Sequence, residues 1–418
     1  MFPNAEIIAV GSELLTPQKI DTNSLFLTDQ LNALGVEVVR KSVVGDDRER
    51  LAATIRAALV SSEVVILTGG LGPTEDDVTR DAVAIATGAR QIFHQGISDT
   101  IEERFRRRGR KMADINKRQA FIIEGAEILP NERGTAPGQW LIHGNTVVIL
   151  LPGPPGELKP MFTGQCLPKL ETLLPKQVIR TRFFRVAGMP ESDLDALIAP
   201  LYTKYTNPVT TILAAAGDIQ IHLRARCATS EEAEALLEEL ATPMLELLGD
   251  RIYTRTGDPI EVVIGQQLRE LEATLSVAES ATGGMLGAKI TSVAGSSDYF
   301  VGGFITYQTE MKSELIGVDA GMIEEYGVVS EEVAMSMAVG TRIHTASTYA
   351  LSITGVAGPD GGTDAAPVGT VIFGFSGPGG TDARRVQMPG DRTLVRLFAT
   401  QTALDIIRRN LARELTEL

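Results

Sequence analysis

A glycine-rich segment near the start of the chain constrains the fold more than any other feature. The segment Val64–Asp81, VVILTGGLGPTEDDVTRD, joins an apolar, β-branched run to three closely spaced glycines and a proline. The run Val64–Leu67 predicts a buried parallel strand. Thr74 and the acidic residues after it predict the start of a helix toward Ala86. Strand, glycine loop and helix start, in this order, indicate an α/β domain with a ligand at the loop.

The chemistry of this loop favours a phosphate ligand. Gly69, Gly70 and Gly72 let the backbone approach an anion, which free N–H groups can then bind. Asp76 and Asp77 lie directly behind the loop and would repel a bare phosphate, which indicates a divalent cation between them and the ligand. The alternative is an ordinary turn with helix-capping acids. The number of glycines and the paired acids favour the ligand site.

The first part of the chain alternates between predicted strands and helices. This alternation predicts a doubly wound, mostly parallel sheet, in which ligands bind beyond the carboxyl ends of the strands. Three strand-end loops, Gly11–Glu13, Gly45–Asp47 and Gly69–Asp77, are expected to converge there. The predicted strands are Ala5–Val10, Val36–Val44, Val64–Leu67 and Asn145–Leu151, and predicted helices run from Asp21 to about Leu34 and from Asp46 or Asp47 to about Leu59.

Two further segments of this region have two interpretations each. The most basic run, Arg104–Lys111 (RFRRRGRK), is either a solvated helix face or a lid that supplies cations to a phosphorylated ligand, and the solvated face is the more common case. The rigid loop Pro152–Gly156 follows a predicted strand and either completes the predicted crevice or is a stiff connector. Asn131–Gly138 is expected to be a turn-rich loop.

The composition excludes several classes of protein. A chain of 418 residues exceeds one typical core, so two or three domains are expected. Its net charge of −14 argues against a broad nucleic-acid-binding surface. Two cysteines, Cys166 and Cys227, cannot build a disulfide framework, and no run is apolar enough for a signal peptide or a membrane span. We therefore expect a cytoplasmic protein. With only four histidines, any metal would have mainly carboxylate ligands.

The middle of the chain, residues 169–256, has a different character. Its strands are of mixed polarity and its helices are acidic and amphipathic, with little active-site chemistry. This order of elements predicts a small α+β module used for spacing or dimerisation. The predicted elements are a strand at Arg180–Arg185, a helix at Pro190–Leu201, an alternating strand at Ile219–Arg226 and a helix at Ser230–Leu248.

The last part of the chain again alternates strands and helices, which predicts a second α/β domain. A loop rich in glycine, Thr354–Gly362, follows one of its strands and is either a backbone nest for phosphate or a flexible turn. The predicted strands are Leu275–Ala278, Phe300–Thr306, Tyr349–Ile353 and Val368–Phe375, and the predicted helices include Ile260–Leu271, Ser330–Thr341 and Arg392–Leu411.

Ser280 is the candidate nucleophile of this last domain. It lies between a predicted strand and a double glycine at a helix start, which places a hydroxyl beside free N–H groups, as in an oxyanion hole. No histidine has an obvious partner position, because His344 is expected to pack within its helix. Lys312 is the better base, since a partly desolvated lysine can accept a proton, and Tyr307 could relay it. Taken alone, a capping serine and a surface lysine remain the commoner interpretation.

Long motifs in a fixed order show that the chain resembles the CinA proteins (competence/damage-inducible protein A) over essentially its whole length. Residues 1–168 resemble a MoaB/MogA-like molybdopterin-binding domain through GSELL, DTN, VGDD, TGGLGPTEDD, NERGTAPG and PGPPGE. Residues 257–418 resemble a nicotinamide-nucleotide amidase domain through ESATGG, AGSSDYFVGGFITY, VSEEVA, ITGVAGPDGG and PVGTV, with Lys312 between them. Residues 169–256 resemble the family's small KH-like domain.

The resemblance implies an enzyme of pyridine-nucleotide salvage with two activities. The C-terminal domain would deamidate nicotinamide mononucleotide to nicotinate mononucleotide and ammonia. In that reaction Ser280 would be the nucleophile, Lys312 its base and Tyr307 an assisting hydroxyl. Backbone N–H groups near Thr282, Gly283 and Gly284 would hold the oxyanion. Thr354 and Gly355 would line the substrate site.

For the N-terminal domain the resemblance implies a metal-dependent ADP-ribose pyrophosphatase that gives AMP and ribose 5-phosphate, with Mg, Mn, Co or Ni as the metal. Related proteins also imply a homodimer. The alternative is a nucleotide- or pterin-binding regulatory or competence-associated protein with little turnover. The implied metal ligands are Asp76, Asp77, Glu13, Asp46 and Asp47, and the implied substrate contacts are Gly69, Gly70, Leu71, Gly72, Thr74, Ser12, Asn23 and Gly138.

Overall fold

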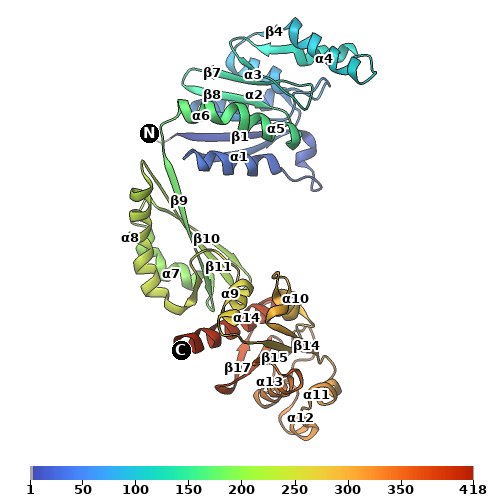
Figure 1. Ribbon diagram of the computed structural model, residues 1–418, viewed down its shortest axis with the longest axis vertical. Helices are drawn as coiled ribbons and strands as arrows, with labels where there is room; N and C mark the ends of the chain where they lie inside the picture. The colour runs from blue at the N-terminus through green and yellow to red at the C-terminus, as the bar shows by residue number, and fades with distance from the viewer. Residues whose placement is uncertain (1–2, 418) are drawn as a thin grey trace. The chain divides into compact units, whose positions relative to one another are not determined.

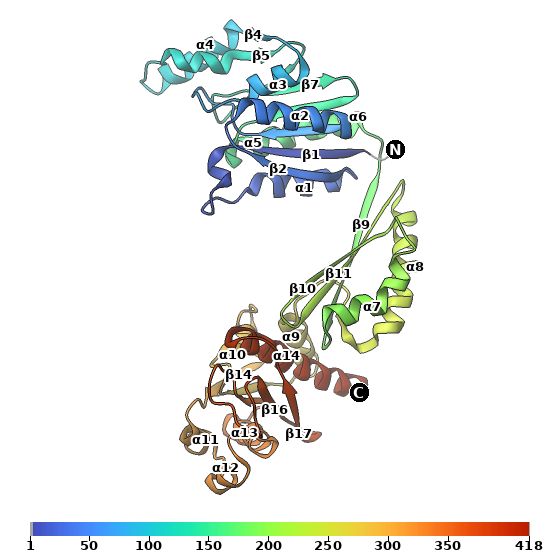
Figure 2. The same ribbon diagram turned by 180° about the vertical axis from the view of Figure 1, so that it is seen from behind.

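The computed structural model describes residues 3–417, which form two compact units. One unit comprises the residues up to Arg180 together with Ala225–Ala235, and the other comprises Thr181–Arg224 together with the residues from Leu236 onward. Figures 1 and 2 show the elements of each unit from opposite sides. No helix within residues 3–417 is both long and apolar enough to cross a membrane.

The N-terminal sheet has the strand order β2-β1-β3-β8-β7-β6. The first four of these strands pair in parallel, whereas β7 and β6 are antiparallel to their neighbours. The predicted doubly wound, mostly parallel sheet is thus confirmed. The strands are β1 Asn4–Val10, β2 Glu37–Val44, β3 Val64–Thr68, β6 Glu127–Leu129, β7 Gly138–His143 and β8 Thr146–Leu151, with a separate pair β4 Gln91–Phe93 and β5 Phe121–Ile123.

Helices cover both faces of this sheet, because successive side chains of a strand point to opposite sides. Ile7 of β1 packs in the core cluster of α1, α5 and α6, whereas Ile8 packs in the cluster of α2 and α3. Figure 1 shows the first group in front of the sheet and Figure 2 shows the second. The helices are α1 Thr22–Ala33, α2 Arg48–Ser61, α3 Thr79–Thr87, α4 Gln95–Arg107, α5 Pro155–Met161 and α6 Leu167–Leu173.

The helix after the glycine loop begins later than predicted. Helix α3 starts at Thr79, and its N-cap residue, Val78, makes no side-chain capping bond. The acidic residues form a turn instead, in which the Asp77 carboxylate accepts hydrogen bonds from the backbone N–H groups of Gly72 (2.7 Å) and Thr74 (2.9 Å). The prediction of a helix cap at Thr74 is therefore wrong, because Asp77 folds back to close the glycine loop.

The middle module is a four-stranded sheet, in the order β10-β11-β9-β12, with two helices. Strand β11 alternates between buried and partly exposed residues, as the period of two predicted. The acidic helix α8 has the predicted limits. The elements are β9 Val178–Ala187, α7 Glu191–Tyr202, β10 Val209–Ala215, β11 Asp218–Cys227, α8 Ser230–Leu248 and β12 Ile252–Thr254.

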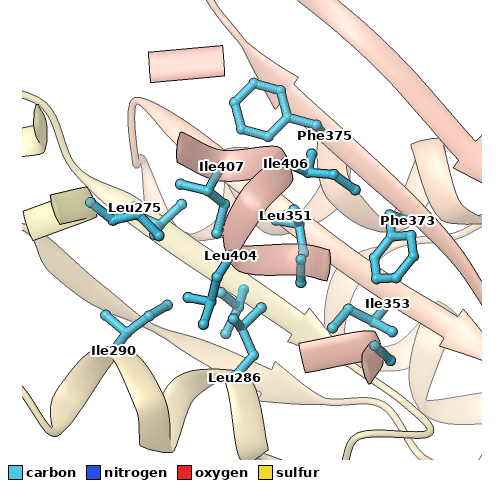
Figure 3. Packing of buried hydrophobic residues seen from close by; sticks show 14 of the residues in the cluster. Leu275, Leu286, Ile290, Leu351, Ile353, Phe373, Phe375, Leu404, Ile406 and Ile407 are labelled. Atoms are coloured by element: carbon cyan, nitrogen blue, oxygen red, sulfur yellow. The ribbon is translucent and has the colours of Figure 1, made fainter. Parts of the chain in front are cut away.

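The C-terminal sheet has the order β14-β13-β15-β16-β17, with the first three strands parallel and the last two antiparallel. Helices α9, α10 and α14 cover one face, and α11 and α13 pack on the other. Figure 3 shows Leu404 and Ile407 of α14 packing over Leu275 and Leu351 of the sheet. The elements are α9 Ile260–Glu270, β13 Leu275–Glu279, α10 Met285–Thr291, β14 Phe300–Ile305, α11 Thr309–Ile316, α12 Ala320–Tyr326, α13 Glu331–Thr345, β15 Tyr349–Gly355, β16 Thr370–Gly377, β17 Gly380–Gln387 and α14 Arg392–Glu417.

Candidate functional site

A pocket of about 800 Å³ lies at the carboxyl ends of β1, β3 and β8. All three predicted strand-end loops contribute to it, which confirms that they converge. Gly69 permits the close approach, since a Cβ there would lie 2.4 Å from the carbonyl oxygen of Val10. The predicted ligand residues that line this pocket are Glu13, Asn23, Asp46, Gly69, Gly70, Leu71, Gly72, Asp76 and Asp77, whereas Ser12, Asp47, Thr74 and Gly138 lie outside its lining.

Side chains behind the glycine loop fix its shape. The buried guanidinium of Arg80 donates to the carbonyl oxygens of Leu71 (2.7 Å) and Gly72 (2.8 Å), and the hydroxyl of Thr79 donates to that of Gly69 (2.8 Å). Burial lowers the pKa of Arg80 to about 10, which leaves the side chain charged at neutral pH. The loop is therefore held from behind by an ionised side chain, and its pocket face is left for a ligand.

Asp47 and Asp77 each accept at least two hydrogen bonds, and Asp46 accepts one, from the backbone N–H of Ser12 at 3.0 Å. Asp47 caps α2 by accepting the N–H groups of Glu49 and Arg50 at 3.1 and 3.0 Å. Asp77 closes the glycine loop, and its carboxylate also accepts the hydroxyl of Thr74 at 2.6 Å. Both carboxylates would have to give up these bonds in order to bind a cation with the same oxygen atoms.

The remaining predicted ligands, Glu13, Asp46 and Asp76, line the pocket. Within residues 3–417 no three acidic, histidine or cysteine side chains lie close enough together to hold a metal ion. The donors present are hard carboxylate oxygens, which suit Mg²⁺ or Mn²⁺. Mg²⁺ commonly takes one or two carboxylates and completes its coordination with water and substrate phosphates. The pocket fits a cation that binds together with a phosphorylated ligand.

In the basic run at the end of α4, some residues fit the solvated interpretation and others lie at the pocket. Arg106 and Arg107 pair with Glu103 on the exposed helix face, as the solvated interpretation predicts. Arg104 instead donates to the carbonyl oxygen of Gly134, and Arg108 lines the pocket. Two cations that the sequence analysis did not single out, Lys19 and Arg133, also line it.

The proline-rich loop after β8 also belongs to this pocket, and Asn23 connects it to α1. The amide nitrogen of Asn23 donates to the carbonyl oxygen of Gly153 at 2.7 Å, and Gly153 lies in the pocket wall. The Asn23 Oδ1 atom is buried and has no hydrogen-bond partner among the described residues. A buried acceptor without a partner is costly, so this atom is a candidate contact for a ligand hydroxyl or amine.

In the C-terminal domain, Ser280 directly follows strand β13, which lies between β14 and β15. Its backbone N–H donates to the carbonyl oxygen of Ile353 at 3.0 Å, which continues the pairing of β13 with β15 by one residue. The residue is 8% exposed. Gly283 and Gly284 follow with φ angles of 61° and 96°, a left-handed conformation that favours glycine. The chain can therefore turn sharply after Ser280 before α10 begins.

Lys312 is fully buried beside the same strand ends. Its Nζ atom donates to the carbonyl oxygen of Thr306 at 2.8 Å, and the Thr306 N–H donates to the carbonyl oxygen of Glu279 at 2.8 Å. The amine is thus anchored one residue beyond β14, next to the strand end that carries Ser280. Burial lowers the pKa of Lys312, because desolvation disfavours the ammonium form. Among the described residues no hydrogen bond joins Ser280 to Lys312.

Two hydroxyl groups near these strand ends lack partners. Thr282 and Thr306 are fully buried, and neither Oγ1 atom has a hydrogen-bond partner within residues 3–417. A buried hydroxyl without a partner costs about 1–3 kcal/mol. Such atoms mark positions where a bound molecule or water would be stabilised.

Tyr307 lies at the surface and is held by an arginine that the sequence analysis missed. Its hydroxyl accepts a hydrogen bond from Nη2 of Arg392 at 2.9 Å, and Nη1 of Arg392 donates to the carbonyl oxygen of Gly358 at 2.8 Å. One helical turn later, Nη2 of Arg396 donates to the carbonyl oxygen of Thr282 at 2.8 Å. The signal in the sequence is the i, i+4 spacing of the two arginines at the start of a helix.

The loop after β15 begins two residues later than predicted. Thr354 and Gly355 belong to the strand, and the Thr354 hydroxyl donates to the carbonyl oxygen of Val328 at 2.9 Å. A Cβ on Gly355 would lie 2.6 Å from the carbonyl oxygen of Thr370, so close strand packing alone accounts for this glycine. His344 lies within α13, as predicted, where its side chain is exposed, bonds the carbonyl oxygen of Gly340 in the same helix at 2.8 Å and contacts the ring of Phe304.

Family models match three consecutive parts of the chain. Residues 6–172 match a "probable molybdopterin binding domain", residues 181–254 a "damage-inducible protein CinA KH domain" and residues 257–411 a "CinA C-terminal domain". Together with the two sites, these matches define a multidomain α/β protein that combines a molybdopterin-binding type of domain with a CinA C-terminal domain. The domain limits predicted at residues 168 and 256 stay predictions.

Relatives extend this similarity over the whole chain. A CinA-like protein of Solibacter usitatus is 60% identical over 98% of both chains, and a CinA-like protein of Koribacter versatilis is 46% identical over 97% of this chain and 99% of its own. A solved structure, the competence/damage inducible protein CihA of Agrobacterium tumefaciens, is 32% identical over 37% of this chain and 93% of its own, with a TM-score of 0.36. The chain belongs to the CinA family, as its motifs predicted.

Proposed function

We propose that the C-terminal domain is a serine–lysine amidase that hydrolyses nicotinamide mononucleotide to nicotinate mononucleotide and ammonia. The observation that carries this proposal is the fully buried amine of Lys312, anchored to the carbonyl oxygen of Thr306 beside the strand end that bears Ser280. A lysine whose pKa is lowered by burial can be neutral and can act as a base. This pairing would supply both a nucleophile and a base for amide hydrolysis without a histidine.

The first half of the reaction forms an acyl-enzyme. Neutral Lys312 removes the proton of the Ser280 hydroxyl, and Oγ attacks the carboxamide carbon to give a tetrahedral oxyanion held by backbone N–H groups. The ammonium of Lys312 then returns its proton to the amide nitrogen. The C–N bond breaks, ammonia leaves, and a nicotinoyl ester remains on Ser280. Catalytic hydrogen bonds often tighten only when the substrate binds, which accounts for their absence between the two side chains here.

The second half releases the product with the same groups. Lys312 takes a proton from a water molecule, and the hydroxide attacks the ester carbon. The C–O bond to Ser280 breaks, and Oγ recovers its proton from Lys312. The net reaction consumes one water and one amide and yields one acid and one ammonia, so the enzyme returns to its starting state.

Arg392, at the start of α14, supplies charge for the phosphate of this substrate. Arg392 lines a cavity of about 490 Å³ beside the loop after β15, a volume that suits a small-molecule ligand. Its guanidinium reaches Tyr307 on one side and the carbonyl oxygen of Gly358 on the other. Guanidinium groups bind phosphate through charge-assisted, often bidentate, hydrogen bonds.

The substrate class is tested by removing the phosphate. Nicotinamide riboside carries the same carboxamide and ribose but no phosphate, so it cannot make the proposed phosphate contact with Arg392. We expect a kcat/KM for ammonia release that is about 10- to 10²-fold lower than that for nicotinamide mononucleotide, since a charged hydrogen bond contributes about 1.5–3 kcal/mol. The measurement is initial-rate ammonia release from both compounds.

Two arginine variants provide the control. An Arg392→Gln enzyme should lose most of the preference for the phosphorylated substrate. Arg413→Gln, on the exposed face of the same helix, should keep it. Equal kcat/KM for the two compounds with the wild-type enzyme would contradict the assignment of a mononucleotide substrate.

For the N-terminal domain we propose metal-dependent hydrolysis of ADP-ribose to AMP and ribose 5-phosphate. The support is the pocket of about 800 Å³, with its glycine loop, its cations and the unpartnered Oδ1 of Asn23. Of the pocket carboxylates Glu13, Asp46 and Asp76, one or two would hold the cation, and water and substrate phosphate would complete its coordination. A divalent cation bound there would neutralise the diphosphate and stabilise the charge that develops on it. Arg80 and Asp77 keep the loop in the shape that receives the diphosphate.

An Asp76→Ala variant is expected to cleave ADP-ribose about 10²- to 10³-fold more slowly than the wild type at saturating Mg²⁺, because it removes a carboxylate from the cation site. The measurement is AMP formation with Mg²⁺ or with EDTA. The control is Glu75→Ala, since Glu75 is an exposed neighbour that pairs with Arg118. Equal cleavage by the wild type in EDTA would contradict the metal requirement. Binding of ADP-ribose without any AMP would favour a binding protein with little turnover.

A further inference from the structure

Glu279 is a buried carboxylate to which the proposed reaction assigns no role. It is the last residue of β13, directly before Ser280, and it is 2% exposed. Its Oε2 atom accepts the backbone N–H groups of Gly284 (3.0 Å) and Leu286 (3.1 Å), and its Oε1 atom accepts that of Gly287 (2.8 Å). Both oxygens are thus used inside the loop that follows Ser280.

These bonds decide which N–H groups remain for an oxyanion. The Gly284 N–H is taken by Glu279, the Gly283 N–H donates to the carbonyl oxygen of Ser280 (3.1 Å), and the Ser280 N–H donates to that of Ile353 (3.0 Å). Within the segment 280–284, only the N–H groups of Ala281 and Thr282 have no hydrogen-bond acceptor among the described residues of the chain. The sequence predicted oxyanion donors near Thr282–Gly284, and the structure leaves Gly283 and Gly284 out of this set.

The orientation of the Ala281 N–H group follows from the turn. The Ser280 carbonyl points into the turn toward Gly283, and a trans peptide directs its N–H opposite to its C=O, so the Ala281 N–H points outward. On the far side, Arg396 holds the carbonyl of Thr282 at 2.8 Å. The loop is therefore fixed at both ends, by Glu279 and by Arg396.

We propose that Glu279 is a positioning residue for the amidase, which clamps the loop so that the N–H groups of Ala281 and Thr282 form the oxyanion hole. This inference rests on the proposed amidase function. The clamp needs a carboxylate, because each of its oxygens faces an N–H group. A glutamine keeps one acceptor oxygen, and its NH₂ group would face a donor. The loop would then shift away from the geometry that stabilises the oxyanion.

The test is a Glu279→Gln enzyme in the full-length chain, assayed by ammonia release from nicotinamide mononucleotide. We expect kcat to fall about 10²-fold, the effect of a lost oxyanion donor, while KM stays within about threefold. A contact made only in the transition state lowers kcat and leaves substrate binding in place. The melting temperature is measured alongside. If Glu279→Gln does not fold, Glu279→Asp, which keeps the charge on a shorter side chain, is expected to lower kcat in the same way.

The matched control is Asp405→Asn. Asp405 is also a buried carboxylate with several bonds, to Arg408 and Arg409, but it lies 13 residues after Arg392 on α14, about 20 Å along the helix. It should lose stability without a change in kcat. An unchanged kcat for Glu279→Gln, or a loss confined to KM or to melting temperature, would overturn the role of Glu279. A wild-type enzyme without ammonia release would instead refute the amidase itself.

Discussion

Replacing Ser280 with alanine is expected to lower the kcat for ammonia release by about 10⁴-fold or more, the scale seen when a catalytic nucleophile is removed. The change deletes one oxygen at the end of β13 and leaves the backbone bond to Ile353 in place. The fold and the KM for nicotinamide mononucleotide should therefore change little. The measurement is steady-state ammonia release, together with the melting temperature of both proteins.

Ser292→Ala is a suitable control for this variant. Ser292 lies at the opposite end of α10, exposed, and its hydroxyl bonds only to the carbonyl oxygen of Lys289 at 2.7 Å. It should keep wild-type kcat. A Ser280→Ala enzyme that still turns over at a similar rate would exclude Ser280 as the nucleophile, and water attack without an acyl-enzyme would then be the leading mechanism.

Replacing Lys312 with methionine is expected to lower kcat about 10²- to 10⁴-fold, the usual contribution of a general base. Methionine keeps the length of the side chain and suits a fully buried site, so the fold should persist. The neutral amine is the active form, and burial lowers its pKa. In the wild type, kcat/KM should therefore rise with pH and level off above that lowered pKa. In the variant, this rise of kcat/KM with pH should be absent.

The same pKa shift has a consequence for stability. Between the lowered pKa of Lys312 and its usual value of 10.5, the unfolded chain binds a proton that the folded chain does not. The free energy of unfolding of the wild type relative to Lys312→Met should therefore rise with pH through this window. Lys289→Met, which removes an exposed amine paired with Glu261, is the control for both readouts. A pH profile identical in wild type and Lys312→Met would rule out Lys312 as the base.

Much of the fold could be predicted because local signals and burial agree in it. The run Val64–Leu67 is apolar at every position, as the buried strand between two helix layers requires. Asp21, Asp47 and Ser330 each cap the predicted helix through a side-chain oxygen. The acidic helix Ser230–Leu248 has an apolar stripe along its whole length, so both ends of this helix could be predicted from the sequence.

Other elements could not be predicted because their sequences carry no clear period. Strand β17, Gly380–Gln387, is an exposed edge strand of mainly polar residues, which pairs with β16 through the backbone ladder and two side-chain hydrogen bonds. Thr74 and Asp77 have the composition of a helix start. In the structure these two side chains bond to each other within the turn instead. The Asp77 carboxylate also accepts the N–H of Gly72, so this arrangement depends on where Gly72 lies.

The candidate site was predictable where side-chain chemistry follows a strand end, as at Ser280 and the glycine loop of the N-terminal pocket. The contributions of Arg392 and Arg396 were not, because both act on carbonyl or hydroxyl groups far away in the sequence. The hydrogen bonds by which Glu279 clamps the loop could not be predicted from the sequence, for a related reason. Its role depends on which backbone N–H groups already have acceptors, and that is known only once the loop has a conformation.

The proposed reaction of this chain is cleavage of the carboxamide of nicotinamide mononucleotide. The most direct test incubates the purified full-length protein with that compound and measures ammonia and nicotinate mononucleotide in the same sample. We predict that both products form in equal amounts, without added metal, because the amidase uses Ser280 and Lys312. A folded protein that releases neither product, at a pH above the lowered pKa of Lys312, would contradict the account.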